Sequence, residues 1–350
     1  MILLLGASGY IGRAFANELR RRGHSFIPLT REAFDYSRFD FLFDYLRTMK
    51  PVFLINAAGY RETADSTNIY GEREKMMAAN AILPQMVARI CLMTKTPWGH
   101  VSSGEIYSGA KVLEEGVLRT EPDLNRTDLR QLFESLPDRF HGFTELDEPN
   151  LTFRNSPCNF FSGTKALAEE TIRDLGQIYI WRPRLLFNEI DEPCNLLHRL
   201  QHQPTVFDHI DSLSHLDDFV KASLDLWEIR APYGIYNVTN PGAISTSKLT
   251  DFLQRVIKPR PRFNFGSPED DPARAGSPAP ESHCILDTTK LLKAGVKIRP
   301  VADALKDSLE RMRTAARAVK NGDTETFQLP SGSRQFAGLP PRINLSTPRW

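Results

Sequence analysis

The chain has 350 residues, 41% of them hydrophobic and 25% charged, which is an ordinary composition for a globular protein and excludes disorder over most of its length. The 44 lysines and arginines nearly balance the 43 aspartates and glutamates, so the chain lacks the basic excess that nucleic acid or an anionic membrane would demand. A small-molecule function is therefore the first expectation.

The targeting and cysteine patterns indicate a cytoplasmic protein. The opening apolar run, residues 1–5, has no basic segment before it and is too short for a signal peptide, and no later segment approaches the length of a membrane span. The four cysteines lie far apart without CxxC pairs or a neighbouring histidine cluster; they are Cys91, Cys158, Cys194 and Cys284. Neither a disulfide framework nor a metal site is indicated, and we expect reduced cysteines.

Short apolar runs alternate with segments of helical periodicity along the chain. Strands are predicted at residues 1–5, 25–29, 52–56, 98–102, 177–181 and 234–238, and helices at residues 14–22, 39–49, 72–93 and 162–175. The sequence Thr-Asn-Pro-Gly at residues 239–242 predicts a turn after the last strand. This alternation predicts an α/β protein of the Rossmann type, in which helices cover both faces of a doubly wound parallel sheet.

A glycine-rich loop joins the first strand to the first helix. Gly6, Gly9 and Gly12 form a G-x-x-G-x-x-G pattern, with Ser8, Tyr10 and Ile11 between them. Glycine lets a pyrophosphate approach the backbone amides at the amino terminus of a helix, where the helix dipole favours negative charge. A glycine turn without a ligand is the alternative, but the strand, loop and helix in register favour a dinucleotide cofactor.

Arg31 follows the second predicted strand in the sequence Leu-Thr-Arg. An enzyme that uses NAD normally has a carboxylate at this point for the ribose hydroxyls, whereas an arginine suits the 2′-phosphate of NADP. The sequence therefore favours NADP (NADPH) over NAD, the alternative being a surface arginine without a ligand.

Several motifs resemble those of the extended short-chain dehydrogenases/reductases. Asn56, Ala57, Ala58 and Gly59 close one strand, Val-Ser-Ser-Gly-Glu-Ile-Tyr at residues 101–107 closes another, and Lys165 begins a helix. Further similarities, at residues 215–218, 234–238 and 286–290, occur in the expected order, so the resemblance covers about residues 1–317. Residues 143–150, 160–170 and 236–244 are most similar to dTDP-4-dehydrorhamnose reductases and plant UDP-4-keto-rhamnose epimerase/reductases.

The resemblance implies a hydride transfer between a nicotinamide and a carbon of a nucleotide-diphosphate sugar. A serine or threonine holds the sugar oxygen, a tyrosine donates the proton, and a lysine bonds the cofactor ribose and lowers the pKa of that tyrosine. Ser103 and Lys165 match the serine and the lysine, while Phe161 stands where the tyrosine is expected and has no hydroxyl.

Glu105 is the second candidate for proton transfer, the alternative being a glutamate at a strand end that faces solvent. The resemblance implies that epimerase/reductases have a cysteine here and that related dehydratases have a glutamate, so Glu105 could move a proton at a carbon next to a 4-keto group. The glycine at position 104, where dehydratases have an aspartate, weakens the dehydratase alternative. The predicted substrate-binding residues are Ser103, Gly104, Glu105, Tyr107, Arg182, Asn195 and Arg199.

The domains are expected to follow these motifs. We expect an NAD(P)-binding domain at residues 1–187, to which a strand and helix from about 205–238 return. An insertion is expected at about 110–150, in which residues 125–136 could form a helix. A smaller, mainly helical substrate-binding cap is expected at residues 188–204 and 239–317, followed by an irregular arm at residues 318–350.

Three functions remain open at this point. The first is an NADPH-dependent reductase of a 4-keto-6-deoxy nucleotide sugar in which Phe161 is a silencing substitution, and the second is a natural epimerase or dehydratase that uses Glu105 or Tyr107. The third is a protein that binds the cofactor or nucleotide sugar without catalysis, which the presence of Ser103 and Lys165 disfavours. The resemblance also implies a homodimer that pairs the helices at residues 72–93 and 162–175.

Overall fold

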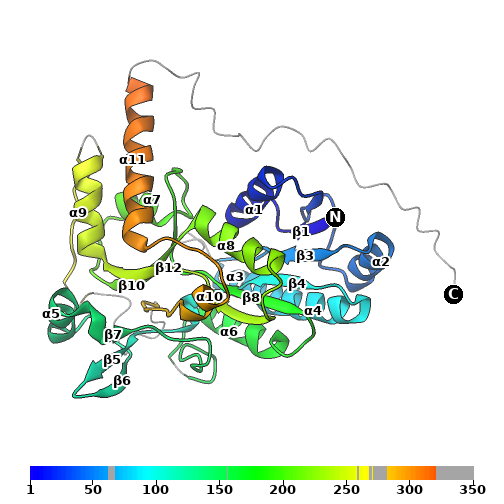
Figure 1. The fold of residues 1–350 in the computed structure, drawn as a ribbon, viewed down its shortest axis with the longest axis horizontal. Coiled ribbons are helices and arrows are strands. Elements are labelled where there is room, and N and C mark those ends of the chain that lie inside the picture. The colour runs from blue at the N-terminus through cyan, green and yellow to red at the C-terminus, as the bar shows by residue number, and fades with distance from the viewer. Residues whose placement is uncertain (62–67, 156, 258–259, 268–269, 271–281, 321–350) are drawn as a thin grey trace.

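The computed structural model describes residues 1–61, 68–155, 157–257, 260–267, 270 and 282–320. A six-stranded parallel sheet with the strand order β11-β8-β4-β3-β1-β2 lies at its centre (Figure 1). The strands are β1 (Ile2–Leu5), β2 (Phe26–Leu29), β3 (Phe53–Asn56), β4 (Trp98–Val101), β8 (Ile178–Arg182) and β11 (Gly234–Asn237). All six predicted strands are in this sheet, which confirms the predicted fold class.

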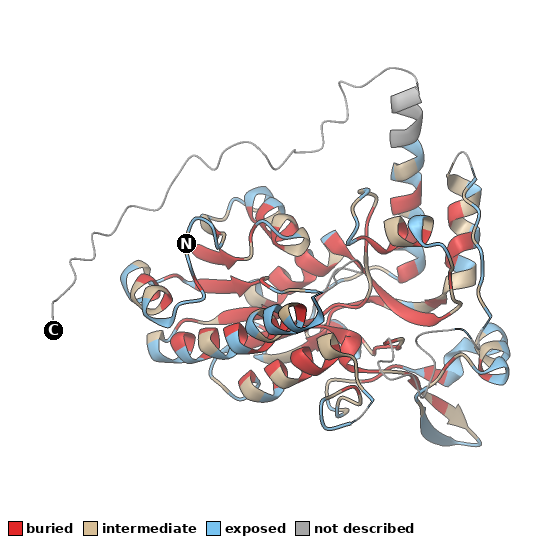
Figure 2. Cartoon of the chain, turned by 180° about the vertical axis from the view of Figure 1, so that it is seen from behind, coloured by how far each residue is buried: buried red, intermediate tan, exposed pale blue. Residues whose placement is uncertain are grey.

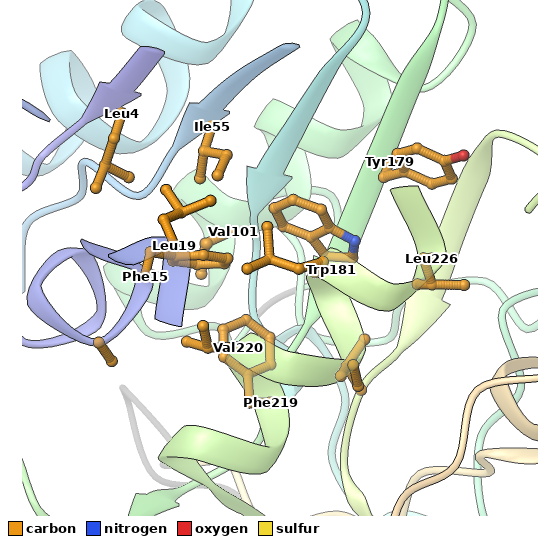
Figure 3. Close-up of a cluster of buried hydrophobic side chains, with 14 of the residues drawn as sticks. Leu4, Phe15, Leu19, Ile55, Val101, Tyr179, Trp181, Phe219, Val220 and Leu226 are labelled. Carbon is orange, nitrogen blue, oxygen red and sulfur yellow. The ribbon is translucent and has the colours of Figure 1, made fainter. Parts of the chain in front are cut away.

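Helices cover both faces of the central sheet. One face packs against α1 (Tyr10–Arg21) and α8 (Leu216–Glu228), whose side chains gather around Trp181 of β8 (Figure 3). The other face packs against α2 (Phe39–Met49), α4 (Leu83–Thr94) and α6 (Phe160–Ile172). Figure 2 shows the consequence, because the central strands are buried while the outer helices expose one side.

The helix predicted at residues 72–93 is longer and contains a π-helical turn. It runs through α3 (Ile69–Met77), the π-helical turn η1 (Ala78–Ile82) and α4. By length and composition this helix could cross a membrane, so the prediction that no segment approaches that length is wrong. However, 56% of its most apolar window is buried, as in a core helix of a folded protein, because α4 packs against the sheet.

A second sheet has the strand order β12-β10-β9, and of its strands only β12 lies within the residues predicted for the cap. Its strands are β9 (Leu186–Phe187), β10 (Ile210–His215) and β12 (Asn240–Ser245), and the helices near it are α7 (Leu196–His202), α9 (Thr246–Val256) and α11 (Val301–Lys320). The short helix α10 (Thr289–Lys293) packs instead against β11 of the central sheet, through Leu291 and Lys290. The expectation of a mainly helical cap therefore missed the second sheet. The turn predicted at residues 239–242 is wrong as well, because Asn240 starts β12 and its buried side chain accepts a hydrogen bond from the His215 amide at 2.6 Å.

The insertion forms a third small sheet with a helix, and its apolar side chains pack against Ile210 and Ile285. It contains β5 (Ala110–Glu114), β6 (Val117–Glu121), α5 (Thr127–Ser135), the 3-10 turn η3 (Pro137–Arg139) and β7 (Phe140–His141), and the strands pair in the order β6-β5-β7. The helix predicted at residues 125–136 is confirmed by α5. The arm expected from residue 318 begins inside α11, and its residues 321–350 lie outside the described part of the chain.

Candidate active site

The glycine loop lies where the strand order of the central sheet reverses, between β1 and β3. Gly6 has a φ of +74°, and a Cβ atom on it would lie 2.6 Å from the amide nitrogen of Ala58. A Cβ atom on Gly12 would lie 2.0 Å from the carbonyl oxygen of Gly6. The loop can take this path only with glycine at both positions, and it brings the amino terminus of α1 to the edge where parallel sheets bind dinucleotides.

The strand end at Asn56 packs directly under this loop. The Asn56 side chain is buried and its Oδ1 accepts a hydrogen bond from the Ala58 amide at 3.1 Å. A Cβ atom on Gly59 would lie 3.6 Å from the Nζ atom of Lys165, so this segment, which includes Ala57, joins the glycine loop to the lysine. Ser8 is exposed in the loop, and Tyr10 donates a hydrogen bond to Asn188 at 3.0 Å.

Arg31 is exposed after β2, on the same side of the sheet as the glycine loop. It lies close enough to the phenol of Tyr36 to lower its pKa, although burial of that phenol raises the pKa overall. The backbone of Gly6 also lowers the pKa of this phenol through a hydrogen bond, so both Arg31 and the glycine loop lie near Tyr36. This is a suitable place for a cation that binds the phosphate of a cofactor ribose.

Ser103, Glu105, Phe161 and Lys165 come together at the carboxyl end of β4. Ser103 caps the 3-10 turn η2 (Gly104–Ile106) by accepting a hydrogen bond from the Glu105 amide at 3.1 Å. Ser162 ties α6 to this turn, because its hydroxyl donates to the Glu105 carbonyl at 2.6 Å. The predicted catalytic residues thus occupy two elements that are bonded to each other.

Lys165 is buried beside the ring of Phe161. Its Nζ atom donates to the Val101 carbonyl at 3.2 Å and lies 5.9 Å from the centre of the ring. Burial lowers the pKa of Lys165 to about 8, against the opposing effect of the carboxylates of Glu169 and Glu105. Lys165 is therefore placed to act on a hydroxyl at the end of the residue-161 ring, which Phe161 does not have.

Two arginines that the sequence interpretation missed surround Glu105. Arg61 pairs with Glu105 through two contacts of 2.7 Å, and the Nη1 atom of Arg184 lies 3.7 Å from the Glu105 Oε1 atom. Burial alone would raise the pKa of Glu105, but these cations hold it at about 2. Both arginines follow strands of the central sheet, Arg61 after β3 and Arg184 after β8, and their position at the carboxyl ends was the signal that could have identified them.

Three of the predicted substrate-binding residues have internal roles in the structure. The Arg182 guanidinium forms a buried ion pair with Glu169 at 2.6 Å and donates to the Tyr107 hydroxyl at 3.0 Å. The buried Asn195 caps α7 by accepting from the Leu197 amide at 2.9 Å. These bonds hold the elements around the site together. The substrate contacts predicted for Arg182, Tyr107 and Asn195 stay predictions.

Arg199, in contrast, lines a pocket of about 390 Å³ between α7 and the second sheet. The stacked rings of His209 and His283 lie on its wall, with centres 3.4 Å apart. Asp211 also lines this pocket and pairs with Arg184, which lies beside Glu105, so the pocket adjoins the catalytic cluster. Among the described residues, no group of three histidine, cysteine or acidic side chains could hold a metal ion.

Comparisons with known proteins found similar sequences and similar folds. The family model of the RmlD substrate binding domain matches residues 1–314. A bifunctional dTDP-4-dehydrorhamnose 3,5-epimerase/dTDP-4-dehydrorhamnose reductase of Arabidopsis thaliana is 29% identical over 166 residues, which are 47% of this chain and 52% of the relative. A trifunctional UDP-glucose 4,6-dehydratase/UDP-4-keto-6-deoxy-D-glucose 3,5-epimerase/UDP-4-keto-L-rhamnose-reductase of the same plant is 28% identical over 166 residues, 47% of this chain and 24% of the relative. The matches thus span about half the length of these curated relatives or less.

Solved structures share the fold over most of the chain. The L780 UDP-rhamnose synthase of Acanthamoeba polyphaga mimivirus superposes with a TM-score of 0.73 at 18% identity, covering 89% of this chain and 99% of the other. A dTDP-4-dehydrorhamnose reductase of Bacillus anthracis, solved in complex with NADP, has a TM-score of 0.66 at 17% identity and covers 90% and 98%. At these identities the likeness concerns the fold alone.

Proposed function

The chain belongs to the RmlD substrate binding domain family, and from that membership we propose that it is an NADPH-dependent reductase of a 4-keto-6-deoxy nucleotide sugar, acting in nucleotide-sugar biosynthesis. One observation supports the proposal: the Nζ atom of Lys165 lies 5.9 Å from the centre of the Phe161 ring and 3.6 Å from where a Cβ atom on Gly59 would lie. The neighbouring Ser162 ties this helix to the turn that Ser103 caps. The names of the plant relatives, which are reductases of 4-keto sugars, support the substrate class.

The proposed roles follow from the positions of the side chains. The glycine loop, with Ser8, Tyr10 and Ile11, would hold the cofactor diphosphate at the amino terminus of α1, and Arg31 would bind its 2′-phosphate. Ser103 would hold the sugar oxygen, and Lys165 would bond the cofactor ribose. Arg199 would bind the nucleotide end of the substrate in the adjoining pocket. The bound cofactor supplies the hydride.

The test is an assay of NADPH oxidation with dTDP- and UDP-linked 4-keto-6-deoxy sugars, in which the sugar product is identified by nuclear magnetic resonance. Consumption of NADPH matched by formation of the 4-hydroxy sugar supports the proposal. Absence of NADPH oxidation with both substrates, in this chain and also in a variant with tyrosine at position 161, contradicts it.

The proposed preference for NADPH depends on Arg31. Replacing Arg31 with alanine should weaken NADPH binding by about tenfold, since a charge-assisted bond to phosphate is lost at an exposed position, and leave NADH binding nearly unchanged. Titration calorimetry with both cofactors measures this. Arg38→Ala is the matched control, because Arg38 is also exposed but pairs with Asp40. Equal weakening of both cofactors would show that Arg31 does not read the 2′-phosphate.

The epimerase or dehydratase alternative requires Glu105 to accept a proton. A carboxylate with a pKa of about 2 that is paired with Arg61 is a weak base near neutral pH, so we expect no solvent deuterium at C3 or C5 of the sugar during turnover in D₂O. Mass spectrometry of the product measures the exchange. Deuterium that enters these carbons in this chain but not in Glu105→Gln would establish Glu105 as an epimerisation base and overturn this expectation.

We further propose the domain division expected from the sequence, a cytoplasmic location and a homodimer. The cofactor domain would comprise residues 1–187, with a strand and helix from about residues 205–238 returning to it, and the cap would comprise residues 188–204 and 239–317. Four free cysteines support a reducing compartment. Exposed apolar side chains on η1 and α4 support a partner on this helix; they are Ile82, Leu92 and Met93.

A further inference from the structure

Arg61 lies over the ring that lacks the expected hydroxyl. Its Cζ atom is 4.6 Å from the centre of the Phe161 ring, and both of its terminal nitrogens contact the carboxylate of Glu105 at 2.7 Å. Two parallel contacts to one carboxylate fix the plane of a guanidinium, which a single contact would not do. A cation is therefore held in a defined orientation against the ring that lacks the hydroxyl.

Glu105 is suited to hold Arg61 in place and poorly suited to replace the missing tyrosine as a proton donor. Its side chain is 10% exposed, and on its inner side it meets Arg184, which is fully buried and pairs in turn with Asp211 at 2.7 Å. With a cation on each side, the carboxylate stays ionised and its position is fixed. The Arg61 side chain is 51% exposed, which makes it the most exposed of the three charged side chains in this cluster.

We propose that Arg61 takes over part of the role of the missing tyrosine, by hydrogen-bonding the keto oxygen of the sugar and stabilising the negative charge that forms on it. The inference rests on the proposed reductase function. Addition of hydride from reduced nicotinamide to the carbonyl carbon oxidises the nicotinamide and moves the carbonyl π pair onto the oxygen. The alkoxide then takes a proton from water and leaves hydroxide. Arg61 keeps its own proton, because the pKa of a guanidinium is about 12 or higher.

Substitution of Arg61 tests this role. Removal of one donor to a developing oxyanion costs about 10²- to 10³-fold in kcat, so Arg61→Ala should lower kcat by that factor with little change in KM. Arg61→Lys keeps a cationic donor, and its kcat should be at least about tenfold higher than that of Arg61→Ala. Arg73→Ala is the matched control. Arg73 lies over the neighbouring Phe160 ring at 5.3 Å, and its removal should leave kcat unchanged.

The same substitution in a chain with tyrosine at position 161 separates catalysis from structural support. If the tyrosine and Arg61 serve the same oxygen, Arg61→Ala should cost less than about tenfold in the Phe161→Tyr background, and the activity of that double variant shows that the alanine chain folds. Two results overturn the inference and leave the proposed function standing. One is an equal loss of kcat in both backgrounds, and the other is that the Phe161 chain is inactive while the Phe161→Tyr chain is active. Inactivity of every variant contradicts the proposed function itself.

Discussion

Replacing Phe161 with tyrosine should raise the rate of NADPH oxidation with a 4-keto-6-deoxy nucleotide sugar by about 10²- to 10⁴-fold, the usual value of a positioned general acid. The substitution adds one oxygen to a ring that the surrounding residues already hold. Lys165 lies 5.9 Å from the centre of that ring, and its positive charge would lower the pKa of a phenol placed there. Steady-state rates from NADPH absorbance measure the gain.

Phe160→Tyr is the matched control for this experiment. Phe160 is the preceding residue of α6, and its ring packs against Phe153 with centres 5.3 Å apart, with Arg73 over its face. We expect its substitution to leave the rate unchanged. An unchanged rate in Phe161→Tyr would instead favour a natural enzyme that works without the tyrosine. If both forms bind NADPH and the nucleotide sugar without turnover, the protein is a non-catalytic binder.

The central fold was predictable because each strand of a parallel sheet is buried on both faces and reads as an apolar run. Residues 39–49 were predicted as a helix, and α2 has the same bounds. The small sheets were not predictable in this way. Asn240, Pro241 and Gly242 have the composition of a turn, yet β12 forms there because β10 supplies antiparallel partners and His215 supplies a bond to the Asn240 side chain. Such pairings depend on tertiary contacts that no local pattern contains.

The site was predictable where motifs are local and unpredictable where charges meet across the fold. The motif positions Ser103, Glu105 and Lys165 indeed lie together. The ion pair of Arg61 with Glu105 joins residues 44 positions apart, and nothing in the sequence says which of many arginines meets that carboxylate. For the same reason Arg182 was predicted to face the substrate, although the structure pairs it with Glu169.

The pair of Arg182 and Glu169 is the place where one substitution should cost the most stability. Both side chains are almost fully buried, at 2% and 4% exposed, and the guanidinium makes three contacts of 3.1 Å or less with the carboxylate. Burial by itself disfavours the charged guanidinium, but the carboxylate of Glu169 raises the pKa of Arg182 above its ordinary value. Arg182→Met would leave Glu169 as a buried charge without this partner, which costs about 3–5 kcal/mol of unfolding free energy.

Urea unfolding followed by circular dichroism measures this loss of unfolding free energy. Arg126→Met is the control, because Arg126 pairs with Asp128 on the surface, where both side chains are more than half exposed. The double variant Arg182→Met/Glu169→Leu should recover much of the loss, since apolar residues of similar size can replace a buried ion pair. Because Glu169 lies on α6 with Lys165, the single variant should also weaken cofactor binding, whereas the double variant should restore it. If Arg182→Met unfolds like Arg126→Met, the pair does not hold α6 against β8, and Arg182 becomes available for the substrate contact first expected of it.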